Sequence, residues 1–162
     1  MPANIRYDSE SMKPWYGDGL RFTCTQCGDC CRTHDDYAHV YLLPNDITRL
    51  AKFHSLERRE FLRQFTKPDA DSGMRTLNWD DEKCVFLGEK GCVVYEARPE
   101  QCRTWPFWPE NLTKEVWAKE IVPFCPGADE GRLYSIGEIK KISRGEGETS
   151  VIAAKPETKR RT

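Results

Sequence analysis

Four cysteines fall within residues 24–31 in the spacing C-x2-C-x2-C-C. Free cysteine often behaves as a small apolar core residue. The residues around these four are mostly polar and show no apolar periodicity, so the window is not part of a hydrophobic core. A chain with this loop must fold in a way that brings several sulfur atoms close together.

The second half of the chain supplies more thiols, and the complete set is Cys24, Cys27, Cys30, Cys31, Cys84, Cys92, Cys102 and Cys125. The C-x2-C spacing lets two thiolates in a tight turn point at one metal, as in zinc sites and iron–sulfur clusters. Gly28 permits the unusual backbone angles of such a turn, and amides of the turn can donate hydrogen bonds to sulfur. We therefore predict that all eight cysteines are metal ligands.

Disulfide bonds are the main alternative use of an even number of cysteines. The chain begins with a polar segment that lacks the apolar stretch of a secretory signal. A bridge between the adjacent Cys30 and Cys31 would also be strained. These features predict a cytoplasmic protein with reduced thiols.

The identity of the metal stays open between a 4Fe–4S cluster and Zn²⁺. Bacterial ferredoxins present three thiolates to one cluster from C-x2-C-x2-C, with a remote cysteine as the fourth ligand. Eight thiolates would equally fill two tetrahedral zinc sites, and an arrangement with some free cysteines also fits. His34 follows Cys31 closely but is more simply a surface or outer residue, and His39 and His54 have no neighbouring ligand pattern.

Composition limits the fold and the partners. Of 162 residues, 38% are hydrophobic and 31% are charged, so the core is small and a metal would help to hold the fold. The net charge of -1 favours neither nucleic acid nor a membrane surface. No apolar run approaches the roughly 20 residues that span a bilayer. The expected partners are the metal and, as a further possibility, another protein.

The first half of the chain predicts a short strand and two helices. The strand is expected over residues 37–43, and a helix from Pro44 to about Phe53, with Asn45 or Asp46 as its cap. Ser55 can cap a second helix over residues 56–65. Apolar residues recur at core spacing in both helices, namely Ile47, Leu50, Ala51, Phe61, Leu62 and Phe65.

The second half predicts a strand over residues 75–79 and a hairpin between residues 83–87 and 92–95, with Leu87 opposite Cys92. Strict alternation would place Cys84 and Cys92 on opposite faces unless a glycine bulge intervenes.

Prolines govern the segment that follows the hairpin. Pro99 suits the start of a short helix that presents Cys102. The prolines between residues 106 and 126 are expected to prevent long regular elements. A last helix is expected near residues 136–142.

These elements together predict a small, loop-rich α+β single domain organised around cysteine-ligated metal sites. We expect an N-terminal arm over residues 1–19, a cysteine-cluster metal-binding domain over residues 20–127, and a partly disordered extension over residues 128–162.

The leading cysteine run, Cys84, Cys92 and the segment Arg98-Pro99-x2-Cys102-Arg103-x2-Pro106-Phe107 resemble the CxxCxxCC, or YkgJ-like, family of zinc- or iron-chelating domains. The resemblance covers about residues 20–127 and implies metal chelation by these cysteines. Some related proteins are flagellin lysine N-methylases, which carry the domain in longer chains. This chain shows no strand–GxGxxG–helix loop for S-adenosylmethionine.

Three functions agree with the sequence, and whether the protein is an enzyme stays undecided. In the first, the metal is structural or carries electrons. In the second, it serves a redox or protein-modifying enzyme, similar to a lysine N-methylase, whose acid–base groups would be Asp29, His34, Asp35 and Asp36. In the third, it stabilises a protein-binding surface between Trp105 and Trp117. Arg98 and Arg103 flank Cys102 and either neutralise thiolate charge or form surface salt bridges.

Overall fold

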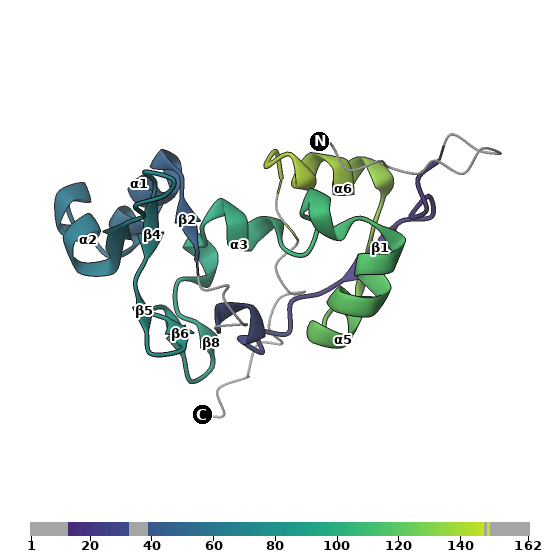
Figure 1. Ribbon diagram of the computed structural model, residues 1–162, viewed down its shortest axis with the longest axis horizontal. Coiled ribbons are helices and arrows are strands. Elements are labelled where there is room, and N and C mark those ends of the chain that lie inside the picture. Colours follow the sequence, from purple (N-terminus) through teal and green to yellow (C-terminus); the bar gives the residue numbers. More distant parts are fainter. Residues whose placement is uncertain (1–12, 33–38, 148, 150–162) are drawn as a thin grey trace, which may run out of the picture. The chain divides into compact units, whose positions relative to one another are not determined.

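The computed structural model describes residues 13–32, 39–147 and 149. The chain divides into two compact units, residues 1–25 with 104–162 (unit 1) and residues 26–103 (unit 2). Short helices are mixed with small antiparallel sheets throughout, which confirms the predicted α+β class (Figure 1). The predicted boundaries near residues 19 and 127 stay predictions, and much of the predicted arm and extension lies outside the described residues.

Two helices form one side of unit 2, as the sequence predicts. The first, α1 (Pro44–Phe53), has the expected bounds, and its residues Ile47, Leu50 and Ala51 are buried. The predicted cap is wrong in position: Leu43 is the N-cap, and Asp46, in the first turn of the helix, accepts at Oδ2 a hydrogen bond from the backbone N–H of Leu43 (2.9 Å).

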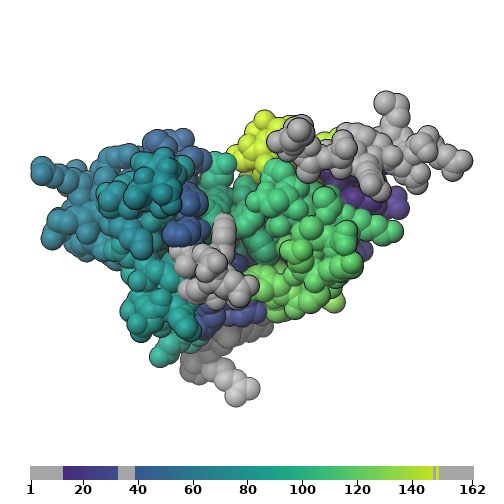
Figure 2. Space-filling model, in the orientation of Figure 1, coloured from purple at the N-terminus to yellow at the C-terminus, as the bar shows by residue number. Residues whose placement is uncertain are grey.

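The second helix, α2 (Arg58–Phe65), starts two residues later than expected. Ser55 adopts a positive φ of 56° and does not cap it, so that detail of the prediction is wrong. Phe61 is nonetheless fully buried, and Leu62 and Phe65 pack beside it. Figure 2 shows the solvent-facing side chains of these helices as blue atoms.

A three-stranded antiparallel sheet packs beside these helices. Its order is β2 (Tyr41–Leu42), β4 (Arg75–Leu77), β3 (Thr66–Pro68). Val40 and Leu42 are both buried, as expected for the predicted first strand. Residues 33–38 of that region lie outside the described part of the chain.

Two very short hairpins follow. In the first, β5 (Trp79–Asp80) pairs with β6 (Lys83–Cys84); in the second, β7 (Leu87–Gly88) pairs with β8 (Gly91–Cys92). Leu87 lies opposite Cys92, as predicted. The continuous strand expected over residues 83–87 is wrong, because β6 pairs back onto β5 and the chain turns before β7.

Unit 2 ends in helical segments. The 3-10 turn η2 (Tyr95–Ala97) leads through Arg98 and Pro99 into α3 (Glu100–Thr104), of which residues 100–103 belong to unit 2. The helix starts after Pro99, as predicted, and the amides of Cys102 and Arg103 both donate to the Pro99 carbonyl (3.0 Å each).

Unit 1 is built on a two-stranded antiparallel sheet, β1 (Leu20–Phe22) with β9 (Arg132–Tyr134). Beside it lie η3 (Pro109–Asn111) and a helical run made of α4 (Lys114–Val116), the π-helical segment η4 (Trp117–Ile121) and α5 (Val122–Phe124). The last helix, α6 (Ile136–Ser143), agrees with the prediction.

The helical run agrees with the expectation that prolines prevent long regular elements here, because its segments have three, five and three residues and the middle one is π-helical. Pro123 falls in the last turn of the run, directly after the π-helical segment. A π-helical turn shifts the hydrogen-bond register by one residue, so the turn before Pro123 does not follow the regular pattern that a proline interrupts. The run then ends at Cys125.

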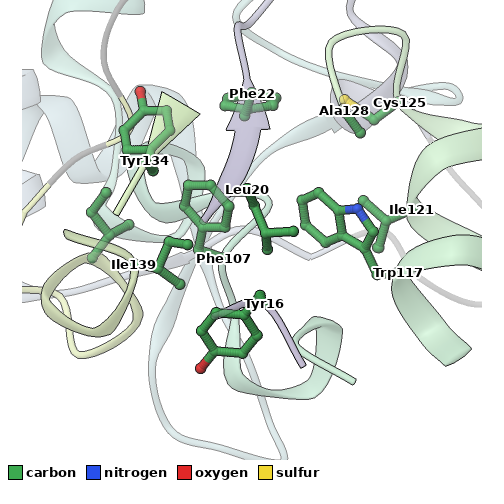
Figure 3. Close-up of a cluster of buried hydrophobic side chains, with 11 residues drawn as sticks. Tyr16, Leu20, Phe22, Phe107, Trp117, Ile121, Cys125, Ala128, Tyr134 and Ile139 are labelled. Atoms are coloured by element: carbon green, nitrogen blue, oxygen red, sulfur yellow. The ribbon is translucent and has the colours of Figure 1, made fainter. Parts of the chain in front are cut away.

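The core of unit 1 is aromatic (Figure 3). Phe107 is fully buried and lies between Trp117, with ring centroids 6.0 Å apart, and Tyr134, 5.1 Å apart. Cys125 lies at the edge of the same cluster, beside Ala128. Across the residues that the structure covers, we find no helix whose length and apolarity would suit a membrane crossing.

Candidate metal centre

The eight predicted ligands are divided between the two units. Six belong to unit 2, and Cys24 and Cys125 belong to unit 1. Cys125 is buried in the core of unit 1, and Cys24 packs against the same apolar cluster. The role of these two as ligands stays a prediction, and the geometry described below concerns unit 2.

The turn after Cys27 has the form that the spacing predicts. Gly28 has a φ of +81°, and the amide of Asp29 donates to the sulfur of Cys27 (3.5 Å). A Cβ on Gly28 would lie 2.7 Å from a methyl group of Leu87, so the turn packs tightly on β7. The sequence therefore needs glycine here both for the backbone angle and for the close approach.

The turn continues into η1 (Asp29–Cys31), which carries two neighbouring thiols. The sulfur atoms of Cys30 and Cys31 are 4.0 Å apart. Two thiolates on one tetrahedral zinc lie about 3.8 Å apart, since each Zn–S distance is about 2.3 Å. The hydrogen bond with Cys31, followed by desolvation, raises the pKa of Cys30 far above its usual range.

A second sulfur-binding turn surrounds Cys84. Cys84 is buried at the end of β6, and the backbone N–H of Phe86 donates a hydrogen bond to its sulfur. This bond spans two residues, like the one from Asp29 to Cys27. Desolvation nevertheless raises the pKa of Cys84 to about 12, so in the absence of a metal its thiol stays protonated at neutral pH.

Cys92 and Cys102 bring two further thiols to the same place. The Cys102 thiol interacts electrostatically with Cys30, Cys84 and Cys92, and the Cys84 thiol interacts with Cys92 and Cys30. Desolvation, reinforced by Cys30, raises the pKa of Cys102 well above its usual range. We call these four the thiol cluster: Cys30, Cys84, Cys92 and Cys102. They come from η1, β6, β8 and α3, so the structure unites residues that are far apart in the sequence.

Polar contacts fix the helix that carries Cys102. The side-chain oxygen of Gln101 accepts from the amide of Tyr41 (3.0 Å), and its NH₂ donates to the carbonyl of His39 (2.9 Å). The amide of Glu100 donates to Asp46 Oδ1 (3.0 Å). These contacts were not predicted from the sequence, and the only available signal was that Glu100 and Gln101 precede a cysteine.

The donor set of the thiol cluster fits a thiophilic metal. Four sulfur ligands suit tetrahedral zinc or an iron–sulfur cluster, and amide donors to Cys27 and Cys84 stabilise thiolate charge. As they stand, no three His, Cys, Asp or Glu side chains within the described residues are close enough to hold a metal ion. Ligation therefore requires the side chains to close around the metal, with release of thiol protons.

Comparison with known proteins agrees with this chemistry. Residues 23–126 match the family described as CxxCxxCC, a "putative zinc- or iron-chelating domain". The chain belongs to this family. The recognition made from the sequence is thus confirmed, and the family's metal agrees with the predicted cofactor, zinc or an iron–sulfur cluster.

One curated relative is the uncharacterized protein MJ0661 of Methanocaldococcus jannaschii. The two proteins are 24% identical over 120 residues, which cover 69% of this chain and 60% of the relative. The chain thus spans less than two thirds of that relative's length. No solved structure matches the chain.

The sequence also predicted candidate residues other than the cysteines. Of the predicted acid–base groups, Asp29 lies in η1, whereas His34, Asp35 and Asp36 lie outside the described residues. Trp117, at one end of the predicted protein-binding surface, is buried in the core of unit 1, so its ring offers no docking surface.

The remaining histidine of interest, His54, is part of an aromatic stack. Its ring lies 4.8 Å from that of Phe65 and 5.2 Å from that of Phe86, measured between centroids. Desolvation lowers the pKa of His54, which favours the neutral ring. We assign it no role at the metal.

Proposed function

We propose that unit 2 binds one structural metal centre through the thiol cluster Cys30, Cys84, Cys92 and Cys102. The observation that carries this proposal is that Cys84, Cys92 and Cys102, from three separate short elements, pack in one buried cluster of unit 2, and Cys30 interacts electrostatically with Cys84 and Cys102. A closed set of four thiolates leaves no open position for a substrate, so we propose a structural or electron-carrying role rather than catalysis.

Zinc is our first candidate for the metal. A ferredoxin-type cluster would be held by Cys24, Cys27 and Cys30 with a remote fourth cysteine, but only Cys30 of these three belongs to the thiol cluster. Four thiolates from separate elements suit a tetrahedral zinc site. A 4Fe–4S cluster is the second candidate, because the C-x2-C-x2-C spacing favours it.

We also propose roles for the four predicted ligands outside the thiol cluster. Cys27 and Cys31 belong to the same turn as Cys30 and are available for ligand exchange or for a cluster of higher nuclearity. Cys24 and Cys125 are candidates for a second centre. Thiolate ligation requires reduced cysteines, so we also propose that the protein works in a reducing compartment such as the cytoplasm.

Metal and acid-labile sulfide analysis of anaerobically purified protein tests the proposal. We expect either zinc without sulfide or iron with an equal amount of sulfide, and we expect Cys102→Ser to lose that metal. Val94→Ala is the control. Val94 is buried in the apolar cluster that also contains Cys84, and its side chain has no atom that can bind a metal. It should lower stability by about 2 kcal/mol and keep the metal. Folded wild-type protein without zinc or iron would disprove the proposal.

A further inference from the structure

One buried cation lies beside the thiol cluster. Arg98 is only 6% exposed, although buried charged side chains are normally paired. Its Nε and Nη1 have no hydrogen-bond partner among the described residues. A guanidinium can only donate hydrogen bonds, so these two N–H groups need acceptors that the described part of the chain does not supply.

The surroundings of Arg98 hold it in place. Its guanidinium carbon lies 3.7 Å from the ring centroid of Tyr95, and its carbonyl accepts a hydrogen bond from Arg49 Nη2 (2.7 Å). Pro99, the next residue, is fully buried at the start of α3. The backbone and one face of the guanidinium are thus occupied, while two of its donors remain unused.

The sulfur atoms of the thiol cluster are the candidate acceptors for these two donors. The positive charge of Arg98 acts on Cys30 and on Cys102 in the direction that stabilises their thiolates. A protonated thiol is a weak acceptor, but a metal-bound thiolate is anionic and accepts strongly. Binding of a metal would therefore create acceptors beside donors that have none.

On the basis of the metal centre proposed above, we propose that Arg98 is a positioning residue of that centre, which donates from Nε and Nη1 to metal-bound sulfur. Four thiolates around a divalent ion carry a net charge of about −2, and one guanidinium offsets half of it. The planar fork of arginine can reach two sulfur atoms at once, whereas a lysine supplies the charge from a single point. Metal binding also gives the two unpaired donors their partners, which ties the affinity for the metal to Arg98.

Titration of metal-free protein with Co²⁺ tests this role, because the cobalt–thiolate charge-transfer band reports on the sulfur atoms. A hydrogen bond lowers the energy of the sulfur lone pairs, so its loss moves the band to lower energy. We expect Arg98→Met to weaken Co²⁺ binding about 10–100-fold and to shift the band. Arg98→Lys should keep more of the affinity but still shift the band.

Arg75→Met is the matched control. Arg75 is a half-buried arginine of the same unit, and its side chain donates hydrogen bonds to neutral oxygen atoms of Leu62 and Thr66. This variant should lose stability while it keeps the wild-type Co²⁺ affinity and spectrum. Equal losses of affinity in Arg98→Met and Arg75→Met would overturn the proposal.

The outcomes separate this inference from the proposed function. If wild-type protein shows no cobalt–thiolate band, the metal centre itself is refuted. If wild type shows the band and Arg98→Met has the same affinity and the same band, only the role of Arg98 is refuted. Circular dichroism shows whether metal-free Arg98→Met is folded. If it is not folded, Arg98→Lys replaces it in the test, and an unshifted cobalt–thiolate band in Arg98→Lys would refute the role of Arg98.

Discussion

Asp46 is the side chain whose removal should do most damage outside the thiol cluster. It is 1% exposed and accepts three hydrogen bonds. Oδ2 accepts from the Leu43 amide at the start of α1, while Oδ1 accepts from the Glu100 amide (3.0 Å) and from Arg49 Nη2 (2.6 Å). One carboxylate thereby joins α1 to the helix that carries Cys102.

The expected cost of Asp46→Ala follows from these contacts. Hydrogen bonds to charged groups contribute about 1.5–3 kcal/mol each, and breaking a buried ion pair costs about 3–5 kcal/mol. The side chain of Arg49 is 31% exposed and can recover part of its hydration, so we take the lower end, about 3 kcal/mol. Against a total stability of about 5–15 kcal/mol, this loss is large.

Urea unfolding followed by circular dichroism measures the loss, in metal-free and in metal-loaded protein. Asp46→Asn keeps the shape but loses the charge and one acceptor, so it should fall between wild type and Asp46→Ala. Glu115→Ala is the control: its ion pair with Lys119 is exposed, and its removal should change stability by less than about 0.5 kcal/mol. A loss below about 1 kcal/mol for Asp46→Ala would refute the reasoning.

Three further predictions concern single positions. Burial lowers the pKa of His54 in the folded protein. The stability that comes from the neutral imidazole is therefore present above the unfolded pKa of about 6.5 and is lost as the pH falls below that value. Between about pH 7 and pH 5.5, the urea midpoint should drop less in His54→Phe than in wild type. A Cβ on Gly127 would lie 1.9 Å from the carbonyl oxygen of Thr23, so Gly127→Ala should lower the melting temperature. A Cβ on Gly137, in the first turn of α6, would meet no atom closer than 3.9 Å, so Gly137→Ala should raise the melting temperature slightly. Ser135→Ala removes the acceptor for the Glu138 amide and should cost about 1 kcal/mol in urea unfolding.

Local signals in the sequence predicted α1, α6 and the cysteine turn correctly. The bounds of α1 follow from Pro44, the capping carboxylate and the apolar spacing, all within ten residues. The turn at Gly28 follows in the same way from one glycine between two cysteines. Such features depend on neighbours in the chain, so the sequence displays them directly.

Pairings between distant segments could not be predicted. The return of β6 onto β5 is decided by two-residue strands, too short to show a period. Asp46 and Glu100 are 54 residues apart, and nothing in either segment marks the other as its partner. For the same reason the sequence offered eight equivalent cysteines and did not show that Cys30, Cys84, Cys92 and Cys102 interact.

The proposed metal centre would matter most for the short hairpins of unit 2. The strands β5, β6, β7 and β8 have only two residues each, and isolated hairpins of this kind are marginal in water. Phe86, Leu87 and Val94 of this segment are buried, whereas Val93, next to Cys92, is 57% exposed. Cys84 and Cys92 lie in these hairpins, and ligation would tie both of them to η1 and α3. Since such a site does not exist in an unfolded chain, the free energy of metal binding would add to the free energy of folding where the paired strands are shortest.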